Sequence, residues 1–402
     1  MSRVTALRTI RIAERPNLIW LEVETDEGLV GLGESFRGAQ AVEASLHEQV
    51  APWLIGRDSR QIEGISRQLM TPYLGFNSSG AEIRAASAVD IALWDLAGKR
   101  HGIPVHEALG GASRTSIRAY NTCAGYAYNT SGTKRRAVSA DEATGGPYDD
   151  QIAFTRDAGV LAESLLSEGY AAMKIWPFDI YAEATGGHMI SLADLKAGLE
   201  PFRRIRAAVG DRIEVMAELH SLWGSHAATR ICRALEDYGV FWAEDPINKM
   251  DDARTLADLR RQTRTPICGS ETLGGVVPFR DLLAADALDM VMLDLAWCGG
   301  LTEGRKIAAL AEAYAKPIAP HDCTGPVTLI AGLHLALHAP TAIFQEVVRA
   351  TLATWYRDLV SVLPTIKDGM VLAPTTPGLG TTLNPDIRRR EDAGVRESGM
   401  PA

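Results

Sequence analysis

The chain has few cysteines, no long apolar run and no excess of positive charge. Its 402 residues include five cysteines, none of them spaced as a CxxC pair. This scattered, odd set predicts neither a disulfide framework nor a zinc ribbon, and it favours a reducing compartment. No stretch reaches the roughly 18 apolar residues of a membrane span, and the N-terminus lacks the apolar core of a signal peptide. We therefore expect a cytoplasmic protein with no membrane partner.

Negative charge exceeds positive charge. The chain has 41 lysines and arginines and 50 aspartates and glutamates, so its net charge is −9. Nucleic acids and anionic membranes are bound by clustered lysine and arginine, so this balance argues against both as partners. The composition, 46% hydrophobic and 23% charged, is that of a globular chain with room for a large domain and a smaller one. The expected partners are small molecules and other copies of the chain, as a homo-oligomer.

Short apolar runs alternate with helical patterns from about residue 115 onward, which is typical of βαβ units. Eight such runs with about seven helical segments between them have the size of a (β/α)8-type barrel. The runs cover residues 117–123, 171–176, 213–219, 240–245, 266–271, 290–294, 317–321 and 342–347. The sequence therefore predicts an α/β protein built around a closed parallel barrel.

The segment before residue 115 has a different residue pattern from the barrel segment. Apolar and polar residues alternate over 18–25, a turn follows at 26–28, and residues 85–101 have helical spacing that ends at Gly102 and Pro104. We predict an α+β domain over 1–113, the barrel over 114–363, and a segment over 364–402 that returns to the first domain. The charged tail after residue 386 is expected to be a solvated or frayed end.

Two predicted connections are unusually long, at residues 124–155 and 177–193. Loops of this length usually carry function, and both would leave the carboxyl-terminal ends of barrel strands, where active sites of barrels lie.

Ionisable residues stand at the ends of the second to eighth predicted strands. A single acid in this position is usually a helix cap, but a series of them converges on one mouth of a closed barrel, which is costly unless they bind something. In the third strand, Glu218 and His220 are expected on one face because side chains alternate along a strand. The residues are Lys174, Glu218 with His220, Glu244 with Asp245, Glu271, Asp294, His321 and Glu346.

Three of these acids, Glu218, Glu244 and Glu271, are 26 and 27 residues apart, one βα repeat in each case. Carboxylates brought side by side raise each other's pKa, and a hard divalent cation relieves the repulsion. All-oxygen ligation with room for substrate oxygens suits Mg²⁺. The spacing therefore predicts a Mg²⁺ site.

Two candidate bases flank this predicted site, Lys174 on the second strand and His321 on the seventh. Asp294 precedes His321 by one repeat and can hydrogen-bond its ring, which makes the pair a candidate general base. Lys174 could instead bind the substrate carboxylate without transferring a proton.

Several further motifs accompany these residues along nearly the whole chain. They are "VETDEGLVGLGES", "ASAVDIALWDLAGKRHGIPVHEALGG", "AELH", "WAEDP", "GSET", "LDLAWCGGLTEGRKIA", "APHDCTGP", "IFQE" and "PGLG". Together they resemble the mandelate racemase-like branch of the enolase superfamily. The resemblance implies an α+β capping domain over a (β/α)7β barrel. It also implies that the three glutamates hold Mg²⁺, which stabilises the enediolate formed when a base removes the proton α to a carboxylate.

His220 indicates which group of enzymes within this branch the chain resembles. Racemase-like members often have asparagine two residues after the third-strand ligand, whereas a histidine there resembles the acid-sugar dehydratases related to galactonate and mannonate dehydratases. This implies that His220 protonates a departing β-hydroxyl after His321 or Lys174 has removed the α proton, giving a 2-keto-3-deoxy acid. His220 could instead orient a carboxylate or act as a fourth ligand. Glu346 is implied to contact the enediolate oxygen.

Two positions depart from the usual pattern of the branch. Glu218 stands where aspartate is commoner, and Trp176 replaces the second lysine of a Lys-x-Lys motif, where it supplies an aromatic wall. Loops of the capping domain are implied to close over the mouth and contact the substrate through Phe36, Arg37 and Tyr73. Arg37 would bind the distal carboxylate of an aldaric acid, or is a surface arginine.

The sequence thus favours a Mg²⁺-dependent dehydratase of an aldonic or aldaric acid. The alternative is a racemase, epimerase or cycloisomerase that uses Lys174 and His321 on opposite faces of the ion. A third reading is a binding protein without catalytic activity on the same scaffold.

Overall fold

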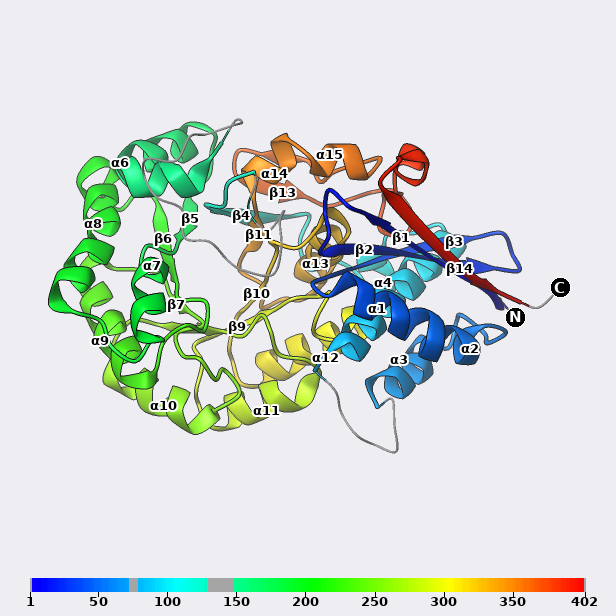
Figure 1. Cartoon of the computed structure of the whole chain (residues 1–402), viewed down its shortest axis with the longest axis horizontal. Coiled ribbons are helices and arrows are strands. Elements are labelled where there is room, and N and C mark those ends of the chain that lie inside the picture. The colour runs from blue at the N-terminus through cyan, green and yellow to red at the C-terminus, as the bar shows by residue number, and fades with distance from the viewer. Residues whose placement is uncertain (1, 72–78, 127, 129–147, 401–402) are drawn as a thin grey trace.

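The computed structural model describes residues 2–71, 79–126, 128 and 148–400. A ring of strands surrounded by helices forms one end of the molecule, and a smaller sheet with its own helices forms the other (Figure 1). Both chain termini lie at the end with the smaller sheet.

The ring consists of parallel strands, and each one overlaps a run that the sequence predicts. Neighbours in the chain are neighbours in the ring, β11 pairs with β4, and a bridge from Ile318 to Ala342 joins the last two segments, so the ring is closed. The strands are β4 (Ser116–Thr122), β5 (Ala172–Ile175), β6 (Glu214–Glu218), β7 (Ala243–Glu244), β8 (Ile267–Gly269), β9 (Met290–Leu293), β10 (Ile318–Pro320) and β11 (Gln345–Val347).

Within the described residues, one long helix connects each strand of the ring to the next, which is the (β/α)7β arrangement that the sequence resemblance implies. Side-chain caps start two of these helices, α8 and α10: Ser191 accepts a hydrogen bond from the amide of Asp194, and Asp252 accepts one from the amide of Thr255, both over 3.0 Å. The helices are α6 (Asp150–Ser167), α8 (Leu192–Val209), α9 (Ser225–Leu235), α10 (Ala253–Gln262), α11 (Val276–Ala284), α12 (Gly300–Ala313) and α13 (Pro326–His338).

A layer of large side chains fills the interior of the barrel. Tyr120 meets Trp242 edge to face at 5.6 Å and Phe344 at 5.9 Å, and Met216 and Met292 are buried in the same cluster. This packed layer supports the carboxyl ends of the strands, where the polar residues lie.

The smaller sheet is antiparallel, in the order β14-β1-β2-β3. Helix α4 lies directly on β3, because a Cβ atom at Gly33 would stand 1.9 Å from the carbonyl oxygen of Ala88. The elements are β1 (Val4–Ile12), β2 (Leu18–Thr25), β3 (Val30–Phe36), β14 (Ala393–Gly399), α1 (Ala39–Ser45), α2 (Ala51–Leu54), α3 (Ile62–Met70), α4 (Ala81–His101) and α5 (Val105–Ala108).

The prediction of a frayed C-terminal end is wrong for β14. This strand pairs with β1 from Ile12 opposite Ala393 to Ala6 opposite Gly399. Arg8 contacts Glu397 across the pair at 2.9 Å, so charged side chains stabilise the strand. The edge strand is largely exposed and has no apolar alternation, so no residue pattern predicted it.

The chain reaches β14 after passing along the barrel. Helices α14 (Arg349–Ala353) and α15 (Tyr356–Leu359) follow β11, and β13 (Met370–Leu372) pairs with both β12 (Ile366–Lys367) and β4. The start of the predicted 364–402 segment therefore lies on the barrel sheet, while its end lies on the smaller sheet. The domain limits at residues 113 and 363 stay predictions.

Acidic side chains of the smaller domain hold the N-termini of two barrel helices. Glu34 accepts hydrogen bonds from the amide and hydroxyl of Thr328 at the start of α13, each over 2.9 Å. Asp90 accepts one from the amide of Thr302 at the start of α12, over 2.8 Å. These contacts fix the capping domain against the barrel. Across the described part of the chain, none of the helices combines the length and apolar character needed to cross a membrane.

Candidate functional site

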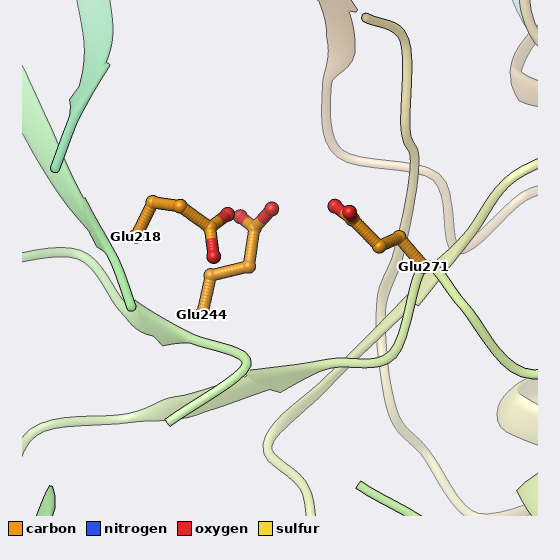
Figure 2. A group of neighbouring side chains, drawn as sticks. All are labelled: Glu218, Glu244 and Glu271. Atoms are coloured by element: carbon orange, nitrogen blue, oxygen red, sulfur yellow. The ribbon is translucent and has the colours of Figure 1, made fainter. Parts of the chain in front are cut away.

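Three carboxylates converge at the carboxyl ends of adjacent barrel strands (Figure 2). Glu218 ends β6, Glu244 ends β7, and Glu271 follows β8. One oxygen from each lies within 4.8 Å of the others, so the three carboxylates could hold one metal ion between them. The other acids of the predicted series do not join this cluster. The structure therefore brings together the residues that the spacing predicts as metal ligands.

The electrostatics of these glutamates fit a cation. Burial raises the pKa of Glu218 to about 7, although the ammonium of Lys174 favours the carboxylate. Burial and the neighbouring Glu218 raise the pKa of Glu244 well above its usual value. The buried Oε2 atom of Glu218 accepts no hydrogen bond from the described residues, although the ammonium of Lys174 lies 3.4 Å from it. Hard, anionic oxygen ligands with one unsatisfied buried atom suit Mg²⁺.

Lys174, on β5, is buried between two of these carboxylates, Glu218 and Glu244, and that of Glu346. Its Nζ donates to Glu244, and lies 3.0 Å from Oε1 of Glu346 and 3.4 Å from Oε2 of Glu218. Burial disfavours the ammonium, but Glu244 and Glu346 raise the pKa of Lys174 well above its usual value. Lys174 is therefore a cation held in position by ion pairs.

His321 follows β10 and forms the predicted pair with Asp294. Nδ1 of His321 lies 2.7 Å from Oδ2 of Asp294, whose Oδ1 accepts the amide of Ala296 over 2.7 Å. Nε2 lies 3.1 Å from Glu271. The ring stacks on Trp297 at a centroid distance of 5.6 Å. The contact with Asp294 thus fixes the orientation of the ring, and Nε2 is the nitrogen that faces the carboxylate of Glu271.

Glu346, on β11, lies between the two candidate bases. Its Oε1 contacts Lys174 and accepts the hydroxyl hydrogen bond of Thr122, and its Oε2 accepts the amide of Asp322 over 2.8 Å and lies 4.0 Å from Nε2 of His321. Burial opposes ionisation, but Lys174 and His321 hold the pKa of Glu346 below its usual value. Glu346 is therefore an ionised carboxylate in the centre of the site.

His220 reaches the site for a different reason from the one the sequence suggests. Strand β6 ends at Glu218, so strand alternation does not place His220. Its backbone has a φ of 51°, in the left-handed region, and its amide donates to Oε1 of Glu218 over 2.5 Å. The turn directs the ring into the cavity, edge-on to Trp176 at 5.5 Å.

One cavity collects most of the predicted site residues. Glu244 and Asp294 lie behind its wall, where they contact Lys174 and His321. Tyr73 lies outside the described residues. The predicted residues that line the cavity are Phe36, Arg37, Lys174, Trp176, Glu218, His220, Glu271, His321 and Glu346.

The cavity also contains residues that the sequence reasoning missed. Thr122, Tyr128, Trp297 and Cys323 line it, and Asp179 contacts His220 from behind. Thr122 ends the first barrel strand, where an uncharged residue gave no signal. Asp179 falls in the predicted long connection 177–193, which was the only indication that this segment matters.

Two family models match the chain. Residues 4–110 match the N-terminal domain of mandelate racemase / muconate lactonizing enzyme, and residues 157–387 match the model described as enolase C-terminal domain-like.

Curated relatives match over almost the whole chain. A D-galactonate dehydratase of Ralstonia nicotianae is 31% identical over 397 compared residues, and the match covers 95% of this chain and 92% of that protein. A D-xylonate dehydratase of Haloferax volcanii is 30% identical over 394 residues, covering 96% of this chain and 88% of that protein.

Solved structures also match this chain closely in shape. An enolase protein from the environmental sequencing of the Sargasso Sea has a TM-score of 0.90 and 63% identity over all of both chains. An enolase of the mandelate racemase subgroup from Agrobacterium tumefaciens has a TM-score of 0.88 and 48% identity over 99% of each chain. The chain is therefore an enzyme of the mandelate racemase and muconate lactonizing enzyme family, within the enolase superfamily.

Proposed function

We propose that this enzyme is a Mg²⁺-dependent dehydratase of a sugar acid, either aldonic or aldaric. It would remove the proton α to the carboxylate and eliminate the β-hydroxyl, giving a 2-keto-3-deoxy acid. The observation that carries the proposal is the presence of His321 and His220 in the cavity that holds Glu218 and Glu271. Relatives named D-galactonate dehydratase and D-xylonate dehydratase support the class of substrate.

Glu218, Glu244 and Glu271 would hold the Mg²⁺ ion. Their mutual distances, the burial of Glu218 and Glu244, and the Oε2 atom of Glu218, which accepts no hydrogen bond from the described residues, fit a hard cation with oxygen ligands. When bound, the ion supplies positive charge beside the substrate carboxylate, where negative charge develops as the α proton leaves.

His321 is the proposed base. Asp294 accepts a hydrogen bond from Nδ1–H, so Nε2 is the nitrogen that faces the cavity, and it acts as the base when the ring is neutral. Nε2 takes the α proton, and the electron pair of the C–H bond moves into the enediolate. The ammonium of Lys174 lies beside Glu346 and Glu218, so it adds fixed positive charge at this end of the site.

His220 is the proposed acid. As the enediolate collapses, its electron pair forms the carbon–carbon double bond of an enol and the bond from the β-carbon to oxygen breaks. Nε2 of His220 gives its proton to that oxygen, which leaves as water. The enol then takes up a proton at the β-carbon and loses the proton of its hydroxyl group, which gives the 2-keto-3-deoxy acid, so atoms and charges balance.

A substrate panel tests the proposal. The enzyme with Mg²⁺ is supplied with aldonic and aldaric acids, and 2-keto product is detected by semicarbazide absorbance. We expect product from at least one acid, none after chelation of the metal, and a loss of about 10²- to 10⁴-fold for His321→Asn. His226→Asn is the matched control, because that histidine is exposed on α9. Silence across the whole panel with saturating Mg²⁺ would sink the proposal.

A racemase or epimerase is the second candidate, and one observation favours it. Lys174 contacts one oxygen of Glu346 and His321 faces the other, so two groups able to move a proton approach the site from two sides. Such an enzyme, or a cycloisomerase, would use the same enediolate. Deuterium incorporation from D₂O at the α-carbon without any loss of water would decide for isomerisation.

A further inference from the structure

The connection between β5 and α8 carries an acidic residue that reaches into the site from outside the barrel. Asp179 begins α7 (Asp179–Ala182), and its Oδ2 atom lies 2.8 Å from Nδ1 of His220. Asp179 is 9% exposed, so this carboxylate is withdrawn from water. The side chain is thus placed against the ring of His220 on the face turned away from the cavity.

The connection is anchored so that Asp179 keeps this place. Phe178 is fully buried and stacks on Phe202 of α8 at 6.2 Å, and Gly198 leaves the space that its ring occupies. Further along, the amide of Gly224 donates to the carbonyl of Gly187 over 2.9 Å. The connection is therefore tied to α8 on one side and to the segment just after His220 on the other.

Several contacts hold the backbone and the ring of His220 in one orientation. Its backbone is in the left-handed region, as is that of Ser221 with a φ of 55°, a conformation that costs energy for residues with side chains. Trp176 packs against the ring, and Nε2 lies 3.5 Å from the hydroxyl of Tyr128. With Asp179 on Nδ1, only Nε2 faces the cavity.

The site therefore contains two histidine–carboxylate pairs with the same construction. Asp294 contacts Nδ1 of His321 at 2.7 Å, and Asp179 contacts Nδ1 of His220 at 2.8 Å. In each pair the acceptor carboxylate keeps the proton on Nδ1 and turns Nε2 toward the cavity. The first pair is built from barrel strands, whereas the second takes its carboxylate from the connection after β5.

We propose that Asp179 is a positioning residue for the elimination half of the reaction. It accepts a hydrogen bond from Nδ1–H of His220 and so fixes the orientation of the ring, with Nε2 aimed at the leaving β-hydroxyl. In the imidazolium form of the ring, Nε2 carries the proton that is given, and Nδ1 keeps the other. This inference rests on the proposed dehydratase function. It assigns removal of the α proton and departure of water to two separately oriented histidines.

The test compares two half-reactions in the intact enzyme with Mg²⁺, in D₂O, on a sugar acid that the wild type dehydrates. Deuterium exchange at the α-carbon of recovered substrate reports the base, and 2-keto product reports the elimination. For Asp179→Ala we expect elimination to fall by about 10- to 100-fold with exchange unchanged within error. Asp179→Asn, whose amide oxygen can still accept from Nδ1, should restore part of the loss. Glu183→Ala, exposed in the same connection, is the matched control and should match the wild type.

A double-mutant cycle separates positioning from a role in folding. Because Asp179 acts through His220, adding Asp179→Ala to His220→Asn should cause no further loss of elimination. Additive losses, equal losses of exchange and elimination, or wild-type elimination in Asp179→Ala would each overturn the inference.

A second measurement needs no substrate. The ¹⁵N chemical shifts of the His220 ring, assigned with the His220→Asn variant, should report a proton on Nδ1 in the wild type and loss of that preference in Asp179→Ala. Equal ring shifts in the two proteins would overturn the inference. A wild type that dehydrates no acid in the panel would instead refute the dehydratase proposal, while the ring shifts still decide the role of Asp179.

Discussion

Glu34 offers a quantitative test of how the capping domain is attached to the barrel. The residue lies on β3 and is fully buried. Its carboxylate accepts the amide and hydroxyl of Thr328 over 2.9 Å each and Nε1 of Trp20 over 2.8 Å. Burial raises the pKa of Glu34 from 4.5 to about 7, despite these hydrogen bonds. The perturbation is Glu34→Gln, which is neutral at every pH.

The magnitude follows from the raised pKa. The folded chain binds this proton more tightly than the unfolded chain, so the resulting stability is present in full below pH 4.5 and is lost as the pH rises to about 7. The interval from 4.5 to about 7 is worth about 3 kcal/mol at 1.36 kcal/mol per pH unit. Glutamine also replaces an acceptor of the Trp20 hydrogen bond by an amide, which costs about 1 kcal/mol at any pH and cancels in a comparison of two pH values.

Urea unfolding at pH 5 and pH 8 measures the effect. The free energy of unfolding of Glu34→Gln, taken relative to that of the wild type, should be higher at pH 8 than at pH 5 by about 2–3 kcal/mol. Glu391→Gln, an exposed substitution in the C-terminal segment, is the control and should show no such difference. If Glu34→Gln changed the free energy of unfolding equally at the two pH values, the reasoning about burial at this interface would be wrong.

Three further predictions concern the site and the contact of α4 with β3. Glu271→Gln should weaken Mg²⁺ binding at least about 10-fold in calorimetry, and unchanged affinity would contradict its role as a ligand. Asp294→Asn should lower α-proton exchange and elimination together, by about 10- to 100-fold, because it acts through the base; loss of elimination alone would contradict this. Gly33→Ala should cost about 3 kcal/mol or more in urea unfolding, because its Cβ would lie 1.9 Å from a carbonyl of α4. The control Gly64→Ala, with nothing within 4 Å, should stabilise the protein by about 0.5–1 kcal/mol, and similar losses for the two would contradict the close approach.

The barrel and its acidic cluster were predictable because the (β/α) repeat has a regular length. Successive strands start about one repeat apart, so Glu218, Glu244 and Glu271 had to end neighbouring strands once the period was recognised. The same argument placed Asp294 beside His321, and the structure gives that contact. These predictions depended only on the order of strands and on the convergence of their carboxyl ends.

Features set by local backbone geometry or by connections were not predictable in this way. His220 lies past the end of β6 and depends on a left-handed turn that alternation does not encode. Asp179 comes from a connection whose path is fixed by the burial of Phe178, and its residue number has no relation to the repeat. Strand β14 is largely exposed and has only two apolar side chains, Ala393 and Val395, so its pairing with β1 left no clear pattern in the sequence.

The central claim is that the base and the acid are two different histidines. The rates of α-proton exchange and of elimination in the His220→Asn variant test it most directly. The variant is incubated with Mg²⁺ and a dehydrated sugar acid in D₂O, and ¹H NMR follows the α-proton of the substrate and the appearance of 2-keto product. A site with the base and the acid on different histidines predicts loss of the α-proton signal by exchange, with product formation reduced by about 10²- to 10⁴-fold. Product formation at the rate of the wild type would contradict the account, because His220 would then have no part in the departure of water.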